Sequence, residues 1–291
     1  MNKLLLSFCS FLLIAATIGA IIMQFSRPEV RESLIYFPLD PELAFTQAET
    51  KLMLLKEKDA DEYTLKWEVD STLPRKVYLR QDISLLFEEG VLKDILNQWE
   101  EEADSLNLEK KVTAEDSNHF QSLSFHYGEV HYQNDHIRSV QKMSSDHLYV
   151  IDSPMTALES FRVPSTEEEK EWKRIIDHAT NQQLLFTRDK LLAHFGIPAG
   201  KYATIPLTEV PAYGEKPFPG LDSAGTQRAI GNLWEGLYKN YVLGLPGPDG
   251  KKASAVGSSI PYILISSDGS HLLVLFEDAE GRPYQLIQYL S

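Results

Sequence analysis

An uncharged, apolar run from Leu4 to Phe25 constrains this chain more than any other stretch of its sequence. Lys3 precedes the run and Arg27 follows it. A helix rises about 1.5 Å per residue, so a run of this length can cross the roughly 30 Å hydrocarbon core of a bilayer, where a helix satisfies its own backbone polar groups. The sequence therefore predicts an N-terminal transmembrane helix within residues 1–26.

A cleaved signal peptide is the alternative interpretation of this run, with an apolar region at residues 4–16 and a cleavage site near Gly19. We favour an uncleaved anchor because the apolar run continues through Met23. Short N-terminal tails usually stay inside the cell, so the body after Phe25 is expected to be extracytoplasmic. The prediction is a single-pass protein of the cell membrane that binds the membrane through residues 4–25, or a secreted protein if it is cut near Gly19.

Composition and charge restrict what the rest of the chain can be. Hydrophobic residues make up 43% of the chain and charged residues 24%, which is typical of a globular protein rather than a disordered one. The net charge is −14, and Lys3 is the only charged residue among the first 26, which leaves −15 for the remainder. An acidic body of this kind excludes nucleic acid as the expected partner. The single cysteine, Cys9, lies in the apolar run, so stability must come from packing.

The fold class predicted for the body is α+β, with two mixed domains built on antiparallel meanders with packed helices. The first domain, residues 27–160, is expected to be mainly β-structure after an N-terminal helix at 42–58. Alternation of apolar and polar residues predicts strands at 63–69 and 77–87, followed by a hairpin loop at 88–90 that returns through Val91 to Trp99. A helix over 83–99 is the competing interpretation, because its apolar residues also recur every four positions.

The remainder of the first domain combines an acidic stretch with a meander. Residues 88–116 carry many carboxylates without the spacing of a calcium loop, which favours a solvated acidic helix or loop. After it, residues 120–151 are predicted to form an antiparallel meander with a tight turn at Asn134–Asp135. Strands are expected on both sides of that turn, the later ones at 137–143 and 148–151.

The second domain, residues 161–291, is predicted to contain helices followed by a three-stranded antiparallel sheet. Ser165 and Thr166 before three glutamates are typical of a helix start. The other expected elements, in chain order, are a short helix at 187–195, a Pro-rich loop at 200–220, a helix at 223–242 and strands at 260–266, 271–276 and 283–289.

Histidines and acids gather between residues 119 and 136, and they are the candidate catalytic residues of the sequence. His126, Glu129 and His131 carry the imidazole and carboxylate groups that zinc or a general base requires. Residues 126 and 131 fall on opposite faces of a regular strand, however, so they converge only if Gly128 forms a bulge. The helical metal-binding motifs are also missing from the sequence. We therefore predict no metal and no cofactor.

Three aromatic residues of the Pro-rich loop, Tyr202, Tyr213 and Phe218, are the candidate binding residues, since flat rings beside such loops often line grooves. With no recognisable catalytic motif, the sequence favours a membrane-anchored extracytoplasmic protein that binds a protein or a cell-envelope component without catalysis. The alternative is a cell-envelope hydrolase, with or without a metal, that uses the region from His126 to His136.

Overall fold

The chain forms antiparallel sheets with packed helices, which confirms the α+β class. A computed structural model describes residues 35–290 apart from 60–61, 155 and 248–250. Within it, Leu34–Ser291 is one compact unit. The predicted membrane anchor lies outside the described residues, and no helix within them is long and apolar enough to cross a membrane.

The larger sheet has six strands in the order β1-β2-β4-β5-β6, with β3 on the other edge of β2. All neighbours in it are antiparallel. A short 3₁₀ turn, η1 (Gln133–Asp135), connects β4 to β5. The strands are β1 (Gln47–Asp59), β2 (Glu62–Glu88), β3 (Val91–Ala114), β4 (Asn118–His131), β5 (Ile137–Ser153) and β6 (Thr156–Phe161).

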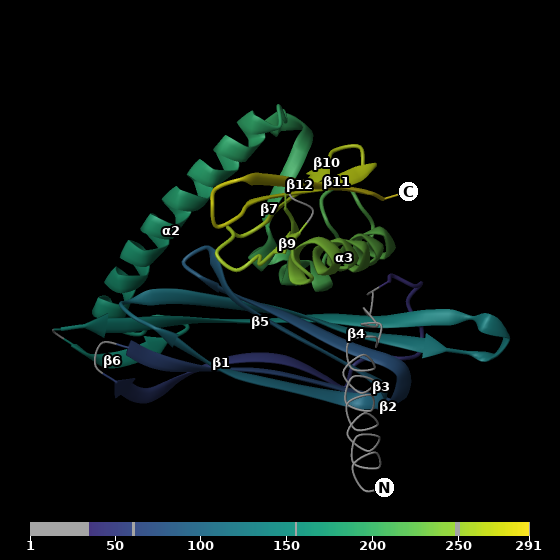
Figure 1. Cartoon of the computed structure of the whole chain (residues 1–291), viewed down its shortest axis with the longest axis horizontal. Coiled ribbons are helices and arrows are strands. Elements are labelled where there is room, and N and C mark those ends of the chain that lie inside the picture. Colours follow the sequence, from purple (N-terminus) through teal and green to yellow (C-terminus); the bar gives the residue numbers. More distant parts are fainter. Residues whose placement is uncertain (1–34, 60–61, 155, 248–250, 291) are drawn as a thin grey trace, which may run out of the picture. The chain divides into compact units, whose positions relative to one another are not determined.

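The long strand β2 folds this sheet back on itself. Its pairing with β3 shifts register between Thr72 and Val77. Before the shift β2 pairs with β1, and after it with β4. The backbone N–H of Leu52 in β1 donates to the Asp146 carboxylate of β5 at 2.8 Å, so β1 lies against β5. Figure 1 shows β1 as a layer beneath β5.

The C-terminal half of the chain covers the other face of β4 and β5. Its four-stranded sheet has the order β12-β11-β10-β7, and β8 pairs with β9 separately. Figure 1 shows α3 between this sheet and the larger one, and α2 rising along one side. The elements are α2 (Glu167–His194), η2 (Ala199–Lys201), β7 (Tyr202–Pro206), η3 (Leu207–Gly214), α3 (Ser223–Leu237), η4 (Tyr238–Val242), β8 (Leu245–Pro246), β9 (Lys252–Ala253), β10 (Tyr262–Ser266), β11 (His271–Glu277) and β12 (Pro283–Tyr289).

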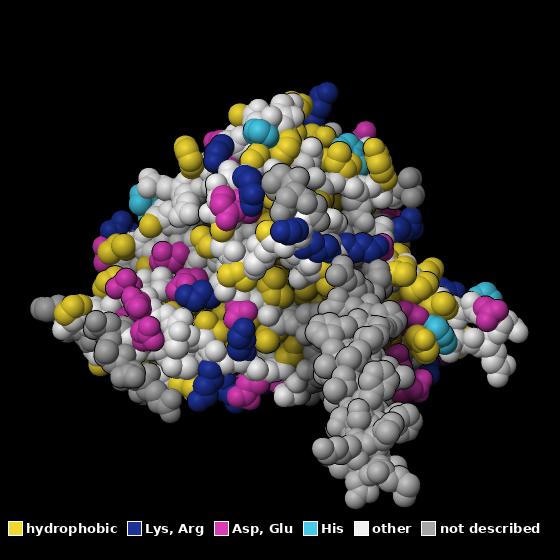
Figure 2. All heavy atoms as spheres, viewed as in Figure 1, with side chains coloured by type: hydrophobic (Ala, Val, Ile, Leu, Met, Phe, Trp, Pro, Cys, Tyr) yellow, Lys and Arg dark blue, Asp and Glu magenta, His cyan; other side chains and the backbone are white. Residues whose placement is uncertain are grey.

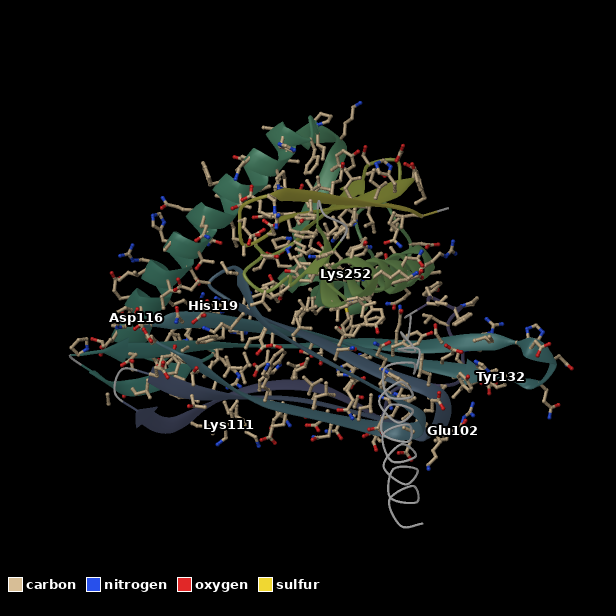
Figure 3. The ribbon with its side chains drawn as sticks, viewed as in Figure 1. Glu102, Lys111, Asp116, His119, Tyr132 and Lys252 are labelled. Carbon is tan, nitrogen blue, oxygen red and sulfur yellow. The ribbon has the colours of Figure 1, made fainter. Side chains whose placement is uncertain are left out.

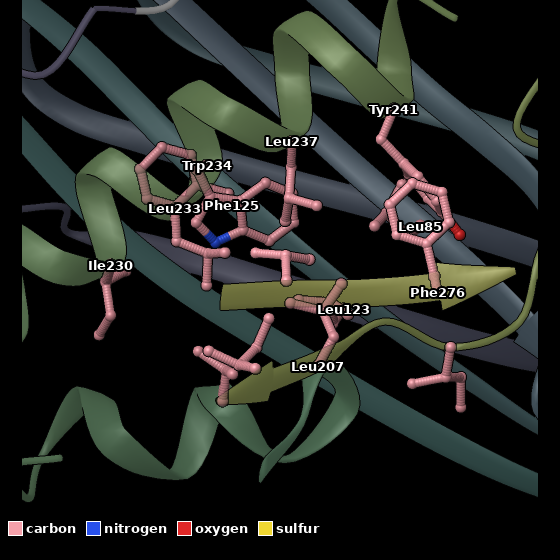
Figure 4. Packing of buried hydrophobic residues seen from close by; sticks show 14 of the residues in the cluster. Leu85, Leu123, Phe125, Leu207, Ile230, Leu233, Trp234, Leu237, Tyr241 and Phe276 are labelled. Atoms are coloured by element: carbon pink, nitrogen blue, oxygen red, sulfur yellow. The ribbon is translucent and has the colours of Figure 1, made fainter. Parts of the chain in front are cut away.

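The largest hydrophobic core lies between the two halves and contains residues from both. It joins one face of β2 and β4 to α3 and to one face of the smaller sheet. The rings of Phe125 and Trp234 stack at its centre, with centroids 5.1 Å apart and planes at 12° (Figure 4). A second core around Trp67 fills the space between the folded layers of the larger sheet. Both faces of β4 are therefore buried along its middle.

Two parts of the first half differ from the sequence prediction. The helix predicted at 42–58 is wrong, because β1 occupies residues 47–59 and pairs with β2. The hairpin return predicted from Val91 to Trp99 is confirmed as the first part of β3, whereas the helix or loop predicted for the acidic residues is wrong, because β3 continues to Ala114. Among the described strands of the larger sheet β3 pairs with β2, and its start also bridges to Ser259; beyond that bridge its exposed carboxylates, such as those of Glu100 and Glu101, lie where charges protect an edge strand from pairing with another chain.

Two elements are longer than predicted. The strands expected at 137–143 and 148–151 are one strand, β5, and the short helix expected at 187–195 is the end of α2. The Pro-rich loop at 200–220 contains β7, which adds a fourth strand to the predicted three. The boundary predicted near Phe161 coincides with the end of β6, whereas independent folding of two domains stays a prediction.

Several local predictions are confirmed. Residues 88–90 form a hairpin connection in which Gly90 has a φ of 87°, the left-handed conformation that glycine favours. The turn at Asn134–Asp135 is present as η1. At the start of α2, Thr166 and Glu169 form a capping box, in which each side chain accepts a hydrogen bond from the other residue's backbone N–H.

Candidate functional site

A chain of hydrogen-bonded polar side chains is buried between the folded layers of the larger sheet. Asp82 Oδ2 lies 2.9 Å from His126 Nδ1, and His126 Nε2 lies 2.7 Å from Ser144 Oγ. The chain continues from Ser144 Oγ to Thr50 Oγ1 at 2.6 Å, and from there to Ser124 Oγ at 2.6 Å. Asp82 and His126 are fully buried, while Ser144 is half-buried. We call these five residues the buried polar chain.

Strand register explains why these residues meet. Asp82 of β2 lies directly opposite His126 of β4, and Ser124 of β4 lies opposite Ser144 of β5. Side chains two apart on a strand share a face, so all of them point toward β1, which contributes Thr50. Residues that are distant in sequence therefore form one continuous network of hydrogen bonds.

Arg80 places a second charged group beside this network. Its guanidinium donates to Ser71 Oγ at 2.5 Å and lies 3.6 Å from Asp82 Oδ1. The backbone carbonyl of Asp104 accepts a further hydrogen bond at 2.6 Å. Burial lowers the pKa of Arg80, and the Asp82 carboxylate opposes that effect. Phe45 covers the group from outside, with its ring 4.8 Å from the guanidinium carbon.

The atom sequence Asp Oδ2, His Nδ1, His Nε2, Ser Oγ is that of a serine-hydrolase triad. In such a triad the histidine can take the serine proton while the aspartate holds the imidazole tautomer. Here, however, Ser144 Oγ also bonds Thr50, and the backbone around it belongs to paired strands. A serine hydrolase also needs two N–H groups that stabilise the developing oxyanion, and the described residues around Ser144 do not offer such a pair. These contacts are those of a hydrogen-bonded network that also stabilises the packing of the strands.

Glu129 and His131 lie apart from His126. The pairing of β4 with β2 and β5 is continuous through Gly128, so there is no bulge, and residues 126 and 131 face opposite sides. Gly128 instead lies opposite Arg80, and a Cβ there would come within 3.4 Å of Arg80 Cδ. The His131 side chain is 39% exposed, hydrogen-bonds Glu129 and stacks on Tyr78 with ring centroids 3.8 Å apart.

Figure 3 shows how far the histidine-rich stretch extends. Tyr132, next to His131, lies at the tip of the β4–β5 hairpin, and His119 lies at the other end of the sheet beneath α2. Within the described ranges, no three His, Cys, Asp or Glu residues are grouped so that they could hold a metal ion. The stretch from 119 to 136 is thus spread along a strand instead of being gathered in one site.

His119 lies apart from the buried polar chain, against the ring of Tyr149. Its ring stacks on Tyr149 with centroids 3.9 Å apart and planes at 2°. Burial lowers its pKa from 6.5 to about 4, although Asp177 of α2 opposes that effect, whereas His147 and Lys173 add to it. Its Nε2 atom is buried and has no hydrogen-bond partner among the described residues. His119 is therefore held in its neutral form.

We expect His119 to make the protein less stable in mild acid. Because the unfolded state takes up the proton near pH 6.5 and the folded state only near pH 4, its contribution is complete above about pH 6.5 and is lost as the pH falls toward 4. Between pH 7 and pH 5 the loss should reach about 2 kcal/mol. His119→Phe keeps a ring on Tyr149 and removes the titration, so urea denaturation should show a smaller loss in the variant. Equal losses in both proteins would contradict this expectation.

A hollow on the surface lies where η3 crosses β5 and the start of α3. Its volume is about 230 Å³, and Phe125, Met143 and Ile230 contribute apolar surface to it. Gln141 and Gln227 provide amides, and the Gln141 Nε2 donates to the Gln227 carbonyl at 2.7 Å. A wider hollow of about 460 Å³ lies on the other side of Pro211 and Ala212. We call the two hollows together the η3 groove.

The three aromatic residues predicted to bind a partner are not all in this groove. Tyr213 lines the wider hollow, and the Lys216 Nζ lies 4.6 Å from the centre of its ring. Phe218 is buried beneath Tyr213, with ring centroids 4.8 Å apart, so it supports the groove from within. Tyr202 lies on β7 in another cluster, where its hydroxyl is 3.0 Å from His271 Nε2.

The residues that the sequence prediction missed are those brought in from other strands. Asp82, Ser144 and Thr50 carry no motif, and only the alternation of polar residues with apolar ones along β2 and β4 hints at a polar inner face. Comparison of the chain with protein-family models, with curated proteins and with solved structures found no match.

Proposed function

We propose that this protein is a membrane-tethered, extracytoplasmic binding protein that receives a segment of a partner protein or envelope component in the η3 groove, without catalysis. The apolar run at residues 4–25 supports the tether. The dimensions and chemistry of the η3 groove support the binding role, and they carry the proposal.

The first described residues would fix the tether to the body near this groove. The backbone N–H of Tyr36 donates to Glu235 of α3 at 3.1 Å, and the Tyr127 hydroxyl donates to the Ile35 carbonyl at 2.7 Å. Leu39 forms a parallel bridge with Ser139 at the start of β5. Residues 26–34 span at most about 30 Å when fully extended. The proposed tether would therefore join the body at Ile35, beside α3 and the start of β5.

The size of the groove indicates the kind of partner. Its apolar hollow, of about 230 Å³, is below the roughly 300–1,000 Å³ of sites that enclose whole small molecules and suits one or two side chains, and the adjoining hollow of about 460 Å³ would take the next part of a longer segment. The apolar floor would take an apolar side chain. The Gln141 Nε2 donates to Gln227, whereas Gln141 Oε1 has no hydrogen-bond partner among the described residues, so it can accept from an adjoining peptide N–H. Lys142 and Glu215 balance each other in charge at the rim.

Filling the groove should abolish partner binding. We expect a photo-crosslinking residue at Glu215, in the full chain in its membrane, to give a discrete adduct. Ala212→Trp should reduce that adduct at least tenfold, because the indole would occupy both hollows, which Ala212 lines. Ala179→Trp on the exposed side of α2 is the matched control and should leave the adduct unchanged. An adduct that survives Ala212→Trp would count against the groove.

A hydrolase is the second candidate function, and the Asp82–His126–Ser144 geometry is the observation that favours it. In this reaction Ser144 would be the nucleophile, His126 the general base and Asp82 the group that orients the imidazole. The substrate would need to displace Thr50 from Ser144 Oγ, and the wider hollow of the η3 groove, whose lining includes Ser144, is the opening beside it. The full burial of His126 makes this candidate the weaker of the two.

A fluorophosphonate probe tests the second candidate directly. An activated Ser144 would displace fluoride from phosphorus while His126 takes the hydroxyl proton, and mass spectrometry would place the adduct on Ser144. Ser144→Ala and His126→Gln should both remove the adduct, whereas Ser145→Ala, which changes the adjacent exposed serine, should not. Absence of labelling at Ser144 in the folded protein would rule out this candidate.

A further inference from the structure

The C-terminal strand β12 is an edge strand without charges. In the part of the chain that the structure describes, it pairs only with β11, so its outer row of backbone N–H and C=O groups has no strand beside it. Its sequence is Pro-Tyr-Gln-Leu-Ile-Gln-Tyr. Natural proteins usually protect such edges with charges, proline, bulges or a covering segment, and of these β12 has, among the described residues, only Pro283 at its first position. The β3 edge of the larger sheet has that protection, while β12 has no charged residue.

Both faces beside β12 offer apolar surface. On the outer face, Ile287 is 54% exposed and Tyr289 is 73% exposed. On the inner face, a groove of about 480 Å³ lies between β12 and α3, with Leu286, Val274 and Leu233 in its lining. An added strand would therefore place alternate side chains on apolar surface on both sides of the sheet.

The charged residues of the groove between β12 and α3 would complement those of a second copy of this chain. Its charged lining residues are Glu235 and Lys239, one turn apart on α3, with Lys239 Nζ 2.5 Å from Glu235 Oε1. A twofold axis beside β12 would bring a second α3 alongside in the opposite direction, so that each Glu235 could face the other copy's Lys239. On the face of the body shown in Figure 2, acidic and basic side chains are interspersed.

We propose that β12 pairs antiparallel with β12 of a second copy of this chain, which joins the two four-stranded sheets into one. A twofold axis near Ile287 sets Ile287 against Ile287 of the second copy, and Tyr289 against Gln285. The net charge of −14 would repel a second copy on average. The uncharged edge and the self-complementary α3 pair let the two bodies approach here without opposing like charges.

Cysteine crosslinking in the membrane-inserted full chain tests the pairing. Cys9→Ser removes the only native cysteine, and Ile287→Cys then places one thiol at the proposed axis. We expect oxidation to give a homodimer whose mass is twice that of the chain. Leu185→Cys in the same background, at an exposed position on α2, should stay monomeric. A dimer of equal yield from both positions, or a crosslink to another protein at Ile287, would overturn the proposal.

Introducing a charge on the edge provides an independent measurement. Ile287→Lys sets two ammonium groups against each other at the axis and should lower the dimer fraction at least tenfold in light scattering of the detergent-solubilised chain. Phe186→Lys, an exposed apolar position on α2, is the matched control and should leave the dimer intact. Circular dichroism should show that both variants fold. A monomeric parent protein, or a dimer unaffected by Ile287→Lys, would overturn the pairing, and the latter would point to the N-terminal segment instead.

Discussion

Asp82→Ala should lower the free energy of unfolding by about 3–5 kcal/mol, one of the two largest effects that we expect from a single change. The change removes the carboxylate that faces the Arg80 guanidinium and hydrogen-bonds Ser71 and His126. Arg80 is fully buried, so its charge would be left without a counter-charge in a medium that solvates it poorly. Guanidinium denaturation of the purified protein at neutral pH measures this loss.

Asp189→Ala is the matched control for Asp82→Ala. Asp189 pairs with Arg188 on the surface of α2, where its side chain is 65% exposed, so its removal should change stability by less than about 1 kcal/mol. The double variant Arg80→Met with Asp82→Leu should cost less than Asp82→Ala alone, because it leaves no unpaired buried charge. A double variant that is less stable than the single one would contradict this explanation.

The predictions that succeeded rest on short-range signals. The capping box at Thr166 and the left-handed Gly90 both follow from chemistry within a few residues. The three C-terminal strands also alternate with turns that carry their own signal, such as the turn at Gly269, where φ is 69°. Elements of this kind are determined by their own sequence, so they can be predicted without the fold.

The wrong predictions concern segments whose structure depends on a partner strand. Residues 52–55 of β1 are apolar in succession, which fits a helix as well as a strand, and pairing with β2 decides between them. The acidic residues of β3 resemble a solvated loop when taken alone, yet they belong to an edge strand, where charge is favourable on the exposed face. In both cases the residue that selects the strand lies outside the local pattern: Leu52 pairs with Trp67, and Glu100 pairs with Arg80.

The same limit applies to the candidate site. His126 was identified by the acids and histidines adjacent to it in sequence, whereas its hydrogen-bond partners are Asp82 and Ser144, 44 and 18 residues away. Strand register, which no local pattern reveals, brings them together. The rule that an odd separation reverses the face of a strand did predict that His126 and His131 would diverge without a bulge. Strand periodicity therefore predicts that His126 and His131 do not share a site, but it does not predict that Asp82, His126 and Ser144 meet.

Trp234→Ala should lower the free energy of unfolding by about 3–5 kcal/mol, the usual cost of removing a buried tryptophan side chain. Trp234 is fully buried on α3 and stacks on Phe125 of β4, so its removal leaves a cavity between the two halves of the body. Because one core cluster includes residues from both halves, we expect the variant and the parent to unfold in one transition. Fluorescence and far-UV circular dichroism should then give coincident curves.

Trp172→Ala is the control that shows whether the effect of Trp234→Ala comes from the shared core or from removing a tryptophan as such. Trp172 is half-buried at the start of α2, beside a small peripheral cluster, so its removal should cost less than that of Trp234. Two separated transitions in Trp234→Ala, one for each half, would mean that residues 27–160 and 161–291 fold independently once their contact is weakened. A single transition at lower denaturant concentration would mean that the shared core makes the two halves one cooperative unit, because neither half retains a stable fold when that core is cut.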